Sequence, residues 1–409
     1  MQKQTSLKGF KKFNLIIILA FMSSLAPLST DMYLPALGEV QKSFSTNSFY
    51  TQLSLASFFI AFALGQLLYG PLSDIYGRKK PLYFGILLFI LSSLACISFD
   101  SIYTFIFFRF LEALGGCAGV VIARAIVNDN FELKEAASVF ALMMVISSLV
   151  PMLSPGLGSI LLDYFSWKSI FAVLFGLGIF LLLLIFLGLN NIKENTASLK
   201  FNSKEIFNNY IKILKDRRFK IYVFSSSFAM ATIFAYITGS SYVFIDYYGL
   251  SEKSYGILFG INAANFMIFA NINARIVRRY SPYYVLPFSF TTMFGIALLL
   301  TIAGFFDLGF LVFEILLFFM IGMLGFIIPN TTTLAMARFK ENSGSASAIL
   351  GAIQFTLAGG ISFVVSYLEA NSPLPLALII TICLIIACRI YFFLNAKRIK
   401  QYKRQWGLK

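Results

Sequence analysis

The chain alternates between long apolar segments and short polar runs. Twelve apolar segments reach about 20 residues, the length that an α-helix needs to cross the hydrocarbon core of a bilayer. They lie at 13–37, 50–70, 80–99, 101–124, 137–160, 168–190, 219–245, 255–274, 283–304, 309–331, 345–368 and 374–396. This pattern predicts an all-α polytopic membrane protein with 12 transmembrane helices.

The longest polar stretch separates the sixth apolar segment from the seventh. We therefore expect two six-helix bundles joined by a polar connection. The predicted parts are an N-terminal bundle at 1–190, a basic cytoplasmic linker at 191–218, and a C-terminal bundle at 219–409 that ends in a basic cytoplasmic tail.

Lysine and arginine side chains lie almost entirely on one side of the apolar segments. Of the 33, 28 lie at the two termini, in the linker or in the connections on the linker's side, and only Lys42, Lys168 and Lys253 lie on the opposite side. Cytoplasmic loops of membrane proteins carry this excess of positive charge. Both termini are therefore predicted to be cytoplasmic, and the net charge of +15 indicates membrane orientation and not nucleic-acid binding.

Composition agrees with membrane insertion and limits the chemistry. Only 12% of the residues are charged, against about 25% in soluble domains, and the mean hydropathy is +0.81. The chain has no histidine, its four cysteines show no metal-ligand spacing, and it contains no G-x-x-x-x-G-K-[ST] phosphate loop. We therefore expect no metal, no cofactor, no ATP hydrolysis and no enzymatic site. Any proton chemistry must use carboxylates.

The most specific motif lies between the second and third segments. It reads Gly70-Pro-Leu-Ser-Asp74-Ile-Tyr-Gly77-Arg78-Lys-Lys. Gly70 and Gly77 permit a tight turn, and Asp74 can engage a cation or a helix N-terminus. The string resembles the G-x-L-x-D-x-x-G-R-R/K loop of the major facilitator superfamily. That resemblance implies the major facilitator fold and a conformational latch at this loop; a basic loop that only orients the chain is the alternative.

Asp31 is the strongest single functional candidate. It lies in the first apolar segment, where burying a carboxylate is costly and favours its neutral form. We expect this segment to be a retained helix and not a cleaved signal peptide. Asp31 is then either a reversible proton carrier or a solvated residue near the outer helix end. The string Thr30-Asp-Met-Tyr33-Leu-Pro-Ala resembles the first helix of the bicyclomycin/chloramphenicol-resistance (Bcr/CflA) branch of drug:proton antiporters, which implies proton and drug coupling at Asp31.

Arg109 and Glu112 lie on one face of the fourth predicted helix, because they are three residues apart. Arg109 lies about 12 Å from the start of that helix, a depth similar to that of Asp31, and should face a cavity or an acid. The string resembles the R-x-x-Q-G motif of the family, whose Arg is implicated in proton coupling, but Glu112 replaces the usual Gln. Glu112 either neutralises Arg109, which we favour, or is a second protonation site.

The fifth predicted helix contains a proline- and glycine-rich string with Pro151, Pro155, Gly156 and Gly158. It resembles, in degraded form, the antiporter motif of the superfamily, in which these residues bend the helix and allow close packing. An ordinary Pro-kinked packing helix is the alternative.

Several polar side chains in apolar segments are candidates for lining a cavity, with helix packing as the alternative. They are Tyr33, Asn262, Asn265, Glu314 and Gln354.

These features together predict proton-coupled export of small, amphipathic drugs. The resemblance implies alternating access across the bacterial inner membrane, with the proton gradient as the energy source. We also expect a monomer in the lipid bilayer. A metabolite facilitator or symporter on the same fold is the first alternative, because a fold does not fix a substrate. A membrane receptor or an intramembrane enzyme is a remote one.

Overall fold

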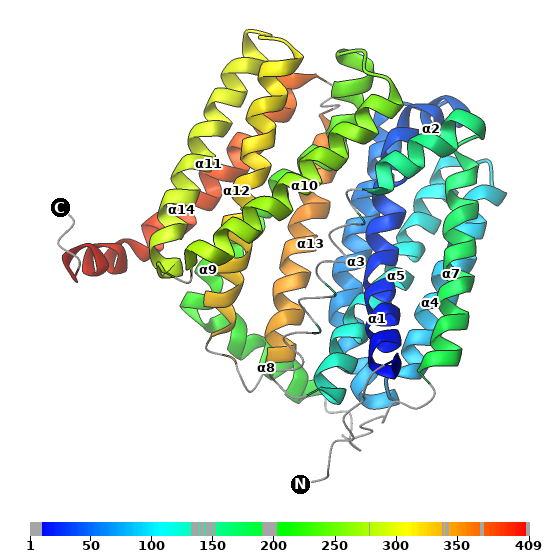
Figure 1. The fold of residues 1–409 in the computed structure, drawn as a ribbon, viewed down its shortest axis with the longest axis horizontal. Coiled ribbons are helices and arrows are strands. Elements are labelled where there is room, and N and C mark those ends of the chain that lie inside the picture. Colours follow the sequence, from blue (N-terminus) through cyan, green and yellow to red (C-terminus); the bar gives the residue numbers. More distant parts are fainter. Residues whose placement is uncertain are drawn as a thin grey trace. The chain divides into compact units, whose positions relative to one another are not determined.

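The computed structural model describes residues 10–131, 139, 143, 150, 153–189, 203–277, 279–337, 339, 343–368 and 372–405. Within these ranges the chain consists of helices and short connections, without strands (Figure 1). Eleven of the described helices are long and apolar enough to cross a membrane. The predicted all-α polytopic fold is therefore confirmed.

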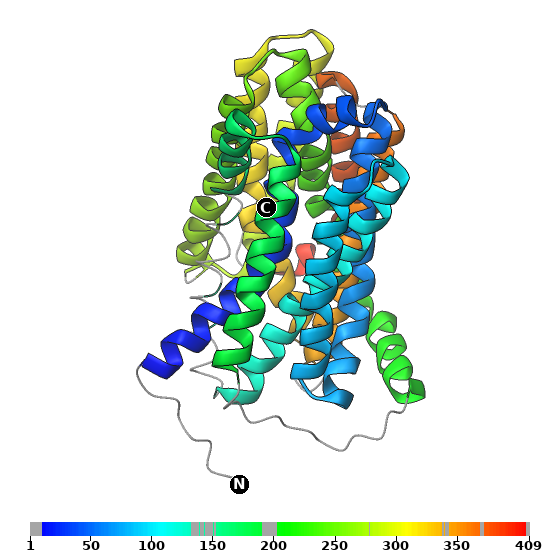
Figure 2. The same cartoon turned by 90° about the vertical axis from the view of Figure 1, so that its right-hand side faces the viewer.

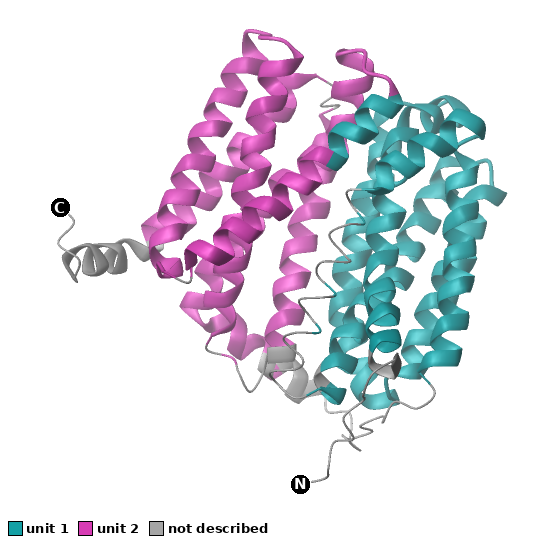
Figure 3. Ribbon diagram, in the orientation of Figure 1, with its two compact units in different colours: residues 1–207, 252–260 teal, residues 208–251, 261–409 magenta. Residues whose placement is uncertain are grey.

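The chain divides into two compact units, coloured separately in Figure 3. Unit 1 comprises residues 1–207 and 252–260, and unit 2 comprises residues 208–251 and 261–409. The units follow packing and not chain order, because the helices at Ser203–Lys215 and Glu252–Val277 each contribute to both. The predicted division at residues 190 and 219 stays a prediction.

Unit 1 is built around one long, central helix. Its helices are α1 (Phe10–Asp31), the 3₁₀ turn η1 (Leu34–Ala36), α2 (Leu37–Ser43), α3 (Ser48–Tyr76), α4 (Lys79–Ser98), α5 (Ile102–Asn130) and α7 (Lys168–Gly188). The central helix α5 packs against α3, α4 and α1, and α1 runs beside α7 (Figures 1 and 2).

Glycines bring α5 close to its neighbours. A Cβ atom at Gly115 would lie 2.5 Å from the Phe89 backbone nitrogen of α4. A Cβ atom at Gly119 would lie 2.4 Å from the Met22 carbonyl oxygen of α1. Small residues permit such backbone contacts between membrane helices. The helix that carries Arg109 is therefore fixed against both α1 and α4.

Unit 2 has α9 at its centre. Its helices are α8 (Ser203–Lys215), α9 (Arg217–Ser241), the π-helical turn η2 (Tyr242–Tyr247), α10 (Glu252–Val277), α11 (Pro282–Phe305), α12 (Phe310–Met336), α13 (Ser343–Tyr367) and α14 (Pro373–Gln405). Only the parts of α8 from residue 208 and of α10 from residue 261 belong to this unit. α9 packs against α12, α13 and α14. It begins at a side-chain cap, where the Asp216 carboxylate accepts hydrogen bonds from the backbone N–H groups of Arg218 (2.9 Å) and Phe219 (2.8 Å).

The predicted end of the first helix needs correction. The first helix was expected over 13–37, but α1 ends at Asp31 and the 3₁₀ turn at Pro35 precedes α2, because proline has no N–H to continue the α-helical hydrogen bonding. The expected linker at 191–218 contains the helix α8. Of the predicted helix at 137–160, residues 139, 143, 150 and 153–160 are described, and they are helical.

Candidate functional site

The side chain of Arg109 is fully buried in a polar cluster that joins three helices of unit 1. Its Nη1 donates to Glu112 Oε2 (2.6 Å) and to Ser29 Oγ of α1 (2.6 Å). Ser93 of α4 donates to the other carboxylate oxygen, Glu112 Oε1 (2.9 Å). Both carboxylate oxygens of Glu112 are therefore occupied, and the buried positive charge has a buried negative partner. This geometry is compatible with neutralisation of Arg109 by Glu112, which stays a prediction beside the alternative of a second protonation site.

Aromatic rings surround the rest of the guanidinium group. Its Cζ lies 4.6 Å from the ring centroid of Phe58, 5.0 Å from that of Tyr33 and 5.4 Å from that of Phe171. Ring faces attract a cation, and the attraction grows when water is excluded. Within the described part of the chain, Nε and Nη2 of Arg109 have no hydrogen-bond partner. The site thus holds a cation with two unused donors.

Asp31 lies at the last residue of α1 and is only 5% exposed. Among the described residues, its carboxylate forms no hydrogen bond or ion pair. The negative end of the helix dipole lies at this terminus and disfavours a charged carboxylate there. The nearby Tyr33, a cavity candidate, is fully buried, and its hydroxyl bonds to Ser54 Oγ (3.1 Å). Arg109 and Asp31 had compatible predicted depths, but Arg109 bonds to Ser29 and not to Asp31.

The latch motif lies at the end of α3 and the start of α4. Gly70 was expected to help form a turn, but it lies inside α3, which also contains Pro71 and continues to Tyr76. Only Gly77 turns the chain, with a positive φ of 80° that favours glycine.

Arg78 forms the charged centre of that motif. It forms an ion pair with Asp74 and donates through Nε to Asp129 Oδ2 at the end of α5 (2.8 Å). Burial alone would lower the pKa of Arg78, but hydrogen bonding and attraction to Asp129 and Asp74 raise it above its ordinary value. Arg78 therefore stays charged and ties the ends of α3, α4 and α5 together.

The predicted antiporter string is described in part. Pro151 lies outside the described residues, and Pro155, Gly156 and Gly158 lie in the helical stretch 153–164. A Cβ atom at Gly158 would come within 2.2 Å of the Met32 carbonyl oxygen, next to Asp31, whereas one at Gly156 would meet nothing within 4 Å. Gly158 is thus required for a close helix contact beside Asp31.

The cavity candidates in unit 2 fall into two groups. Asn262 Nδ2 donates to Glu314 Oε1 (2.8 Å), whereas Asn265 Nδ2 donates to the Phe318 backbone oxygen (2.5 Å) and so ties α10 to α12. Gln354 is buried on α13, and no hydrogen bond joins it to Glu314 among the described residues. Asn262 and Glu314 therefore form a cluster, whereas Asn265 joins two helices; cavity lining by these side chains stays a prediction.

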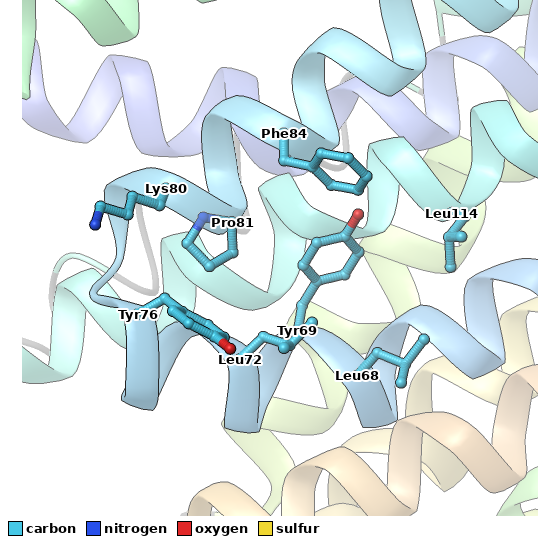
Figure 4. A pocket seen from close by; sticks show the side chains of 8 residues that line it. All are labelled: Leu68, Tyr69, Leu72, Tyr76, Lys80, Pro81, Phe84 and Leu114. Atoms are coloured by element: carbon cyan, nitrogen blue, oxygen red, sulfur yellow. The ribbon is translucent and has the colours of Figure 1, made fainter. Parts of the chain in front are cut away.

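A groove of about 310 Å³ lies on unit 1, along the end of α3 and the start of α4 that carry the latch motif (Figure 4). It is lined by Leu68, Tyr69, Leu72, Tyr76, Lys80, Pro81, Phe84 and Leu114. The Lys80 amino group points away from the rings of Tyr69 and Phe84 in this view. None of the predicted site residues lines this groove, so its shape does not identify the site.

Sequence reasoning missed several partners in these clusters. The missed partners are Ser29, Ser93, Asp129 and Tyr236. Only the folded chain brings them to Arg109, Glu112, Arg78 and Asn262, respectively. For Asp129 the sequence offered one clue. It is an acid in the connection after the fourth predicted helix, on the same side of the membrane as the basic residues.

Comparison with known proteins adds independent evidence. The family described as Major Facilitator Superfamily matches residues 19–363. The uncharacterized MFS-type transporter YdgK of Bacillus subtilis (strain 168) is 34% identical over 96% of this chain and 98% of its own length. A bicyclomycin resistance protein homolog of Haemophilus influenzae is 28% identical over 95% of this chain and 98% of its own. In fold, the crystal structure of a D-xylose-proton symporter is similar, with a TM-score of 0.73, 14% identity, and coverage of 92% of this chain and 97% of the other.

Proposed function

The chain belongs to the major facilitator superfamily of transporters, and on this basis we propose that it exports small amphipathic drugs in exchange for protons. The match to a bicyclomycin resistance protein homolog confirms the predicted resemblance to the Bcr/CflA branch and supports a drug-like substrate. The transported molecule itself is part of the proposal.

The observation that carries the proposal is the different state of two buried acids in unit 1. Glu112 is bonded to Arg109 and Ser93, so it is a fixed counter-ion. Asp31 is buried without a cationic partner among the described residues. An intramembrane carboxylate of this kind marks an ion or substrate path by default. We therefore assign proton exchange to Asp31 and a structural charge balance to Glu112.

Antiport follows if drug and proton favour different conformations. A ligand shifts a conformational equilibrium only by its difference in affinity for the two states. Protonation removes the charge of Asp31, and drug binding that favours the ionised form would release that proton. The cluster of Arg78, Asp74 and Asp129 would act as the proposed latch, which holds one conformation and is released in the other.

We also propose the orientation and setting of the transporter. The 28 basic residues on one side, against three on the other, support cytoplasmic termini in a bacterial inner membrane. A monomer in the lipid bilayer suffices for the proposal, because both candidate clusters are formed within this chain.

The decisive experiment is Asp31→Asn in a host that lacks its own drug pumps. Asn keeps the size and polarity of the side chain but cannot exchange a proton, so efflux driven by the proton gradient should be lost while the protein remains in the membrane. Asp100→Asn is the matched control, because Asp100 is an acid of the same unit with a side chain 91% exposed. Full gradient-driven efflux by Asp31→Asn would refute Asp31 as the carrier.

A second candidate function is transport of a metabolite, either by facilitation or by symport. The similarity in fold to a D-xylose-proton symporter favours it. Wild-type transport that continues after a protonophore collapses the gradient would indicate a facilitator. Uptake of a sugar or other metabolite together with protons would indicate a symporter. Either result would replace the antiport proposal.

A further inference from the structure

Glu314 lies inside unit 2 beside polar side chains from two other helices. Its Oε1 accepts a hydrogen bond from Asn262 Nδ2 of α10 (2.8 Å), and the same nitrogen donates to Tyr236 Oη of α9 (3.1 Å). Glu314 is 8% exposed, and the other two side chains are 2% exposed. Glu314 Oε2 and Asn262 Oδ1 have no hydrogen-bond partner among the described residues. Two acceptor oxygens are therefore buried and unused.

No cationic side chain balances Glu314 in the described part of unit 2. It is the only charged residue of α12, and α11 and α13 contain none. The only charged residue in the membrane-spanning part of α14, Arg389, is exposed. The basic residues of α9 lie in its first turn, at 217–220, and those of α10, Lys253 and Arg275, lie about 13 Å or more along the helix from Asn262 at 1.5 Å per residue. The acid therefore differs from the neutralised Glu of unit 1.

An ionised carboxylate in this position is poorly stabilised. The effective cost of burying a single ion is several kcal/mol unless a partner repays it. One hydrogen bond from a neutral amide is a weak compensation, because a carboxylate can accept at about four lone-pair sites. A bound cation, or a proton, would remove the cost. A proton is the ligand that needs no cavity.

We infer that the cluster of Glu314, Asn262 and Tyr236 is a second proton-binding site, in unit 2, separate from Asp31. Asn262 suits both forms of the acid. With Glu314 ionised, the amide nitrogen donates to the carboxylate, as in the structure. With Glu314 protonated, a half-turn of the amide presents Oδ1 as an acceptor for the carboxyl proton and for the Tyr236 hydroxyl. The amide changes from donor to acceptor without a change in shape, so the backbone need not move.

Infrared spectroscopy of the purified full-length protein tests the site directly, without any drug. The C=O stretch of a protonated carboxyl group should disappear as the pH rises, and Glu314→Gln should lack this band. Asp307→Asn is the matched control: Asp307 is an exposed acid between α11 and α12, and Asn tolerates its positive φ of 46°. Asn262→Ala should keep the Glu314 band but shift its frequency, because the amide acceptor is lost.

Two results of the infrared experiment would overturn the inference that Glu314 binds a proton beside Asn262. If Glu314→Gln has the same carboxyl bands as the wild type at every pH, Glu314 binds no proton. If Asn262→Ala leaves the frequency unchanged, the amide does not bond to the protonated acid. Glu314→Gln keeps the size of the side chain and an acceptor for Asn262, so we expect it to fold. If Glu314→Gln does not fold, Asn262→Ala gives a second test.

The role in transport rests on the proposed antiport and needs a separate readout. In weakly buffered solution, a drug should release protons from the wild type, about half as many from Glu314→Gln or Asp31→Asn, and none from the double variant, if each site exchanges one proton. Unchanged release from Glu314→Gln would exclude this site from coupling. No release from the wild type would refute antiport itself, while the infrared titration would still decide whether Glu314 binds a proton.

Discussion

Glu112→Gln tests whether the buried pair on α5 is a fixed ion pair. The side chains of Arg109 and Glu112 are both 0% exposed. Breaking a buried pair on one side costs about 3–5 kcal/mol, because the other charge stays buried. The Gln carbonyl keeps a hydrogen bond worth about 1 kcal/mol. We therefore expect a loss of about 2–4 kcal/mol, which for a domain of roughly 200 residues lowers the melting temperature by roughly 4–16 °C.

Thermal unfolding in detergent can be followed with a thiol-reactive dye. Cys96 and Cys117 are buried in unit 1 and become reactive only when it unfolds. Lys168→Gln is the control, since it removes a charge from the exposed pair with Asp100 and should leave the melting temperature unchanged.

A double variant separates the charge pair from other effects of substitution. Replacing both partners, Arg109→Met with Glu112→Met, removes the unpaired charge, and such exchanges are often neutral for stability. The double variant should therefore melt above Glu112→Gln. If Glu112→Gln has the same melting temperature as the wild type, the ion pair is refuted. Glu112 would then already be neutral in the native protein, and the alternative of a second protonation site at Glu112 would hold.

The fold could be predicted from sequence because a membrane imposes one length and one kind of helix. An apolar run long enough to span the bilayer has to form its backbone hydrogen bonds within itself, and therefore forms a helix. The helix expected at 80–99 is accordingly α4, at Lys79–Ser98. Hydropathy does not detect where a helix ends within an apolar run. α1 therefore ends before the predicted residue 37, at a turn that contains Pro35.

The site could be predicted only where its residues are close in sequence. The spacing of Arg109 and Glu112 already places them on one helical face, and the structure joins them. Ser29 is 80 residues from Arg109, and Asn262 is 52 residues from Glu314. A serine or asparagine in an apolar helix has the same sequence signal whether it bonds its own backbone or a distant side chain, so such partners need the tertiary structure.

Two further predictions concern the latch and the helix contact beside Asp31. Asp129→Asn should reduce efflux more than Asp74→Asn, because Asp129 is 17% exposed and Asp74 is 51% exposed and better screened by water; equal effects in the efflux assay would contradict this. Gly158→Ala should impair efflux and lower the melting temperature, since its Cβ would come within 2.2 Å of a backbone oxygen that cannot move without the end of α1. Gly156→Ala, where the Cβ meets nothing within 4 Å, is the matched control. If both alanine variants match the wild type, the close contact does not position Asp31, and the helix is an ordinary packing element.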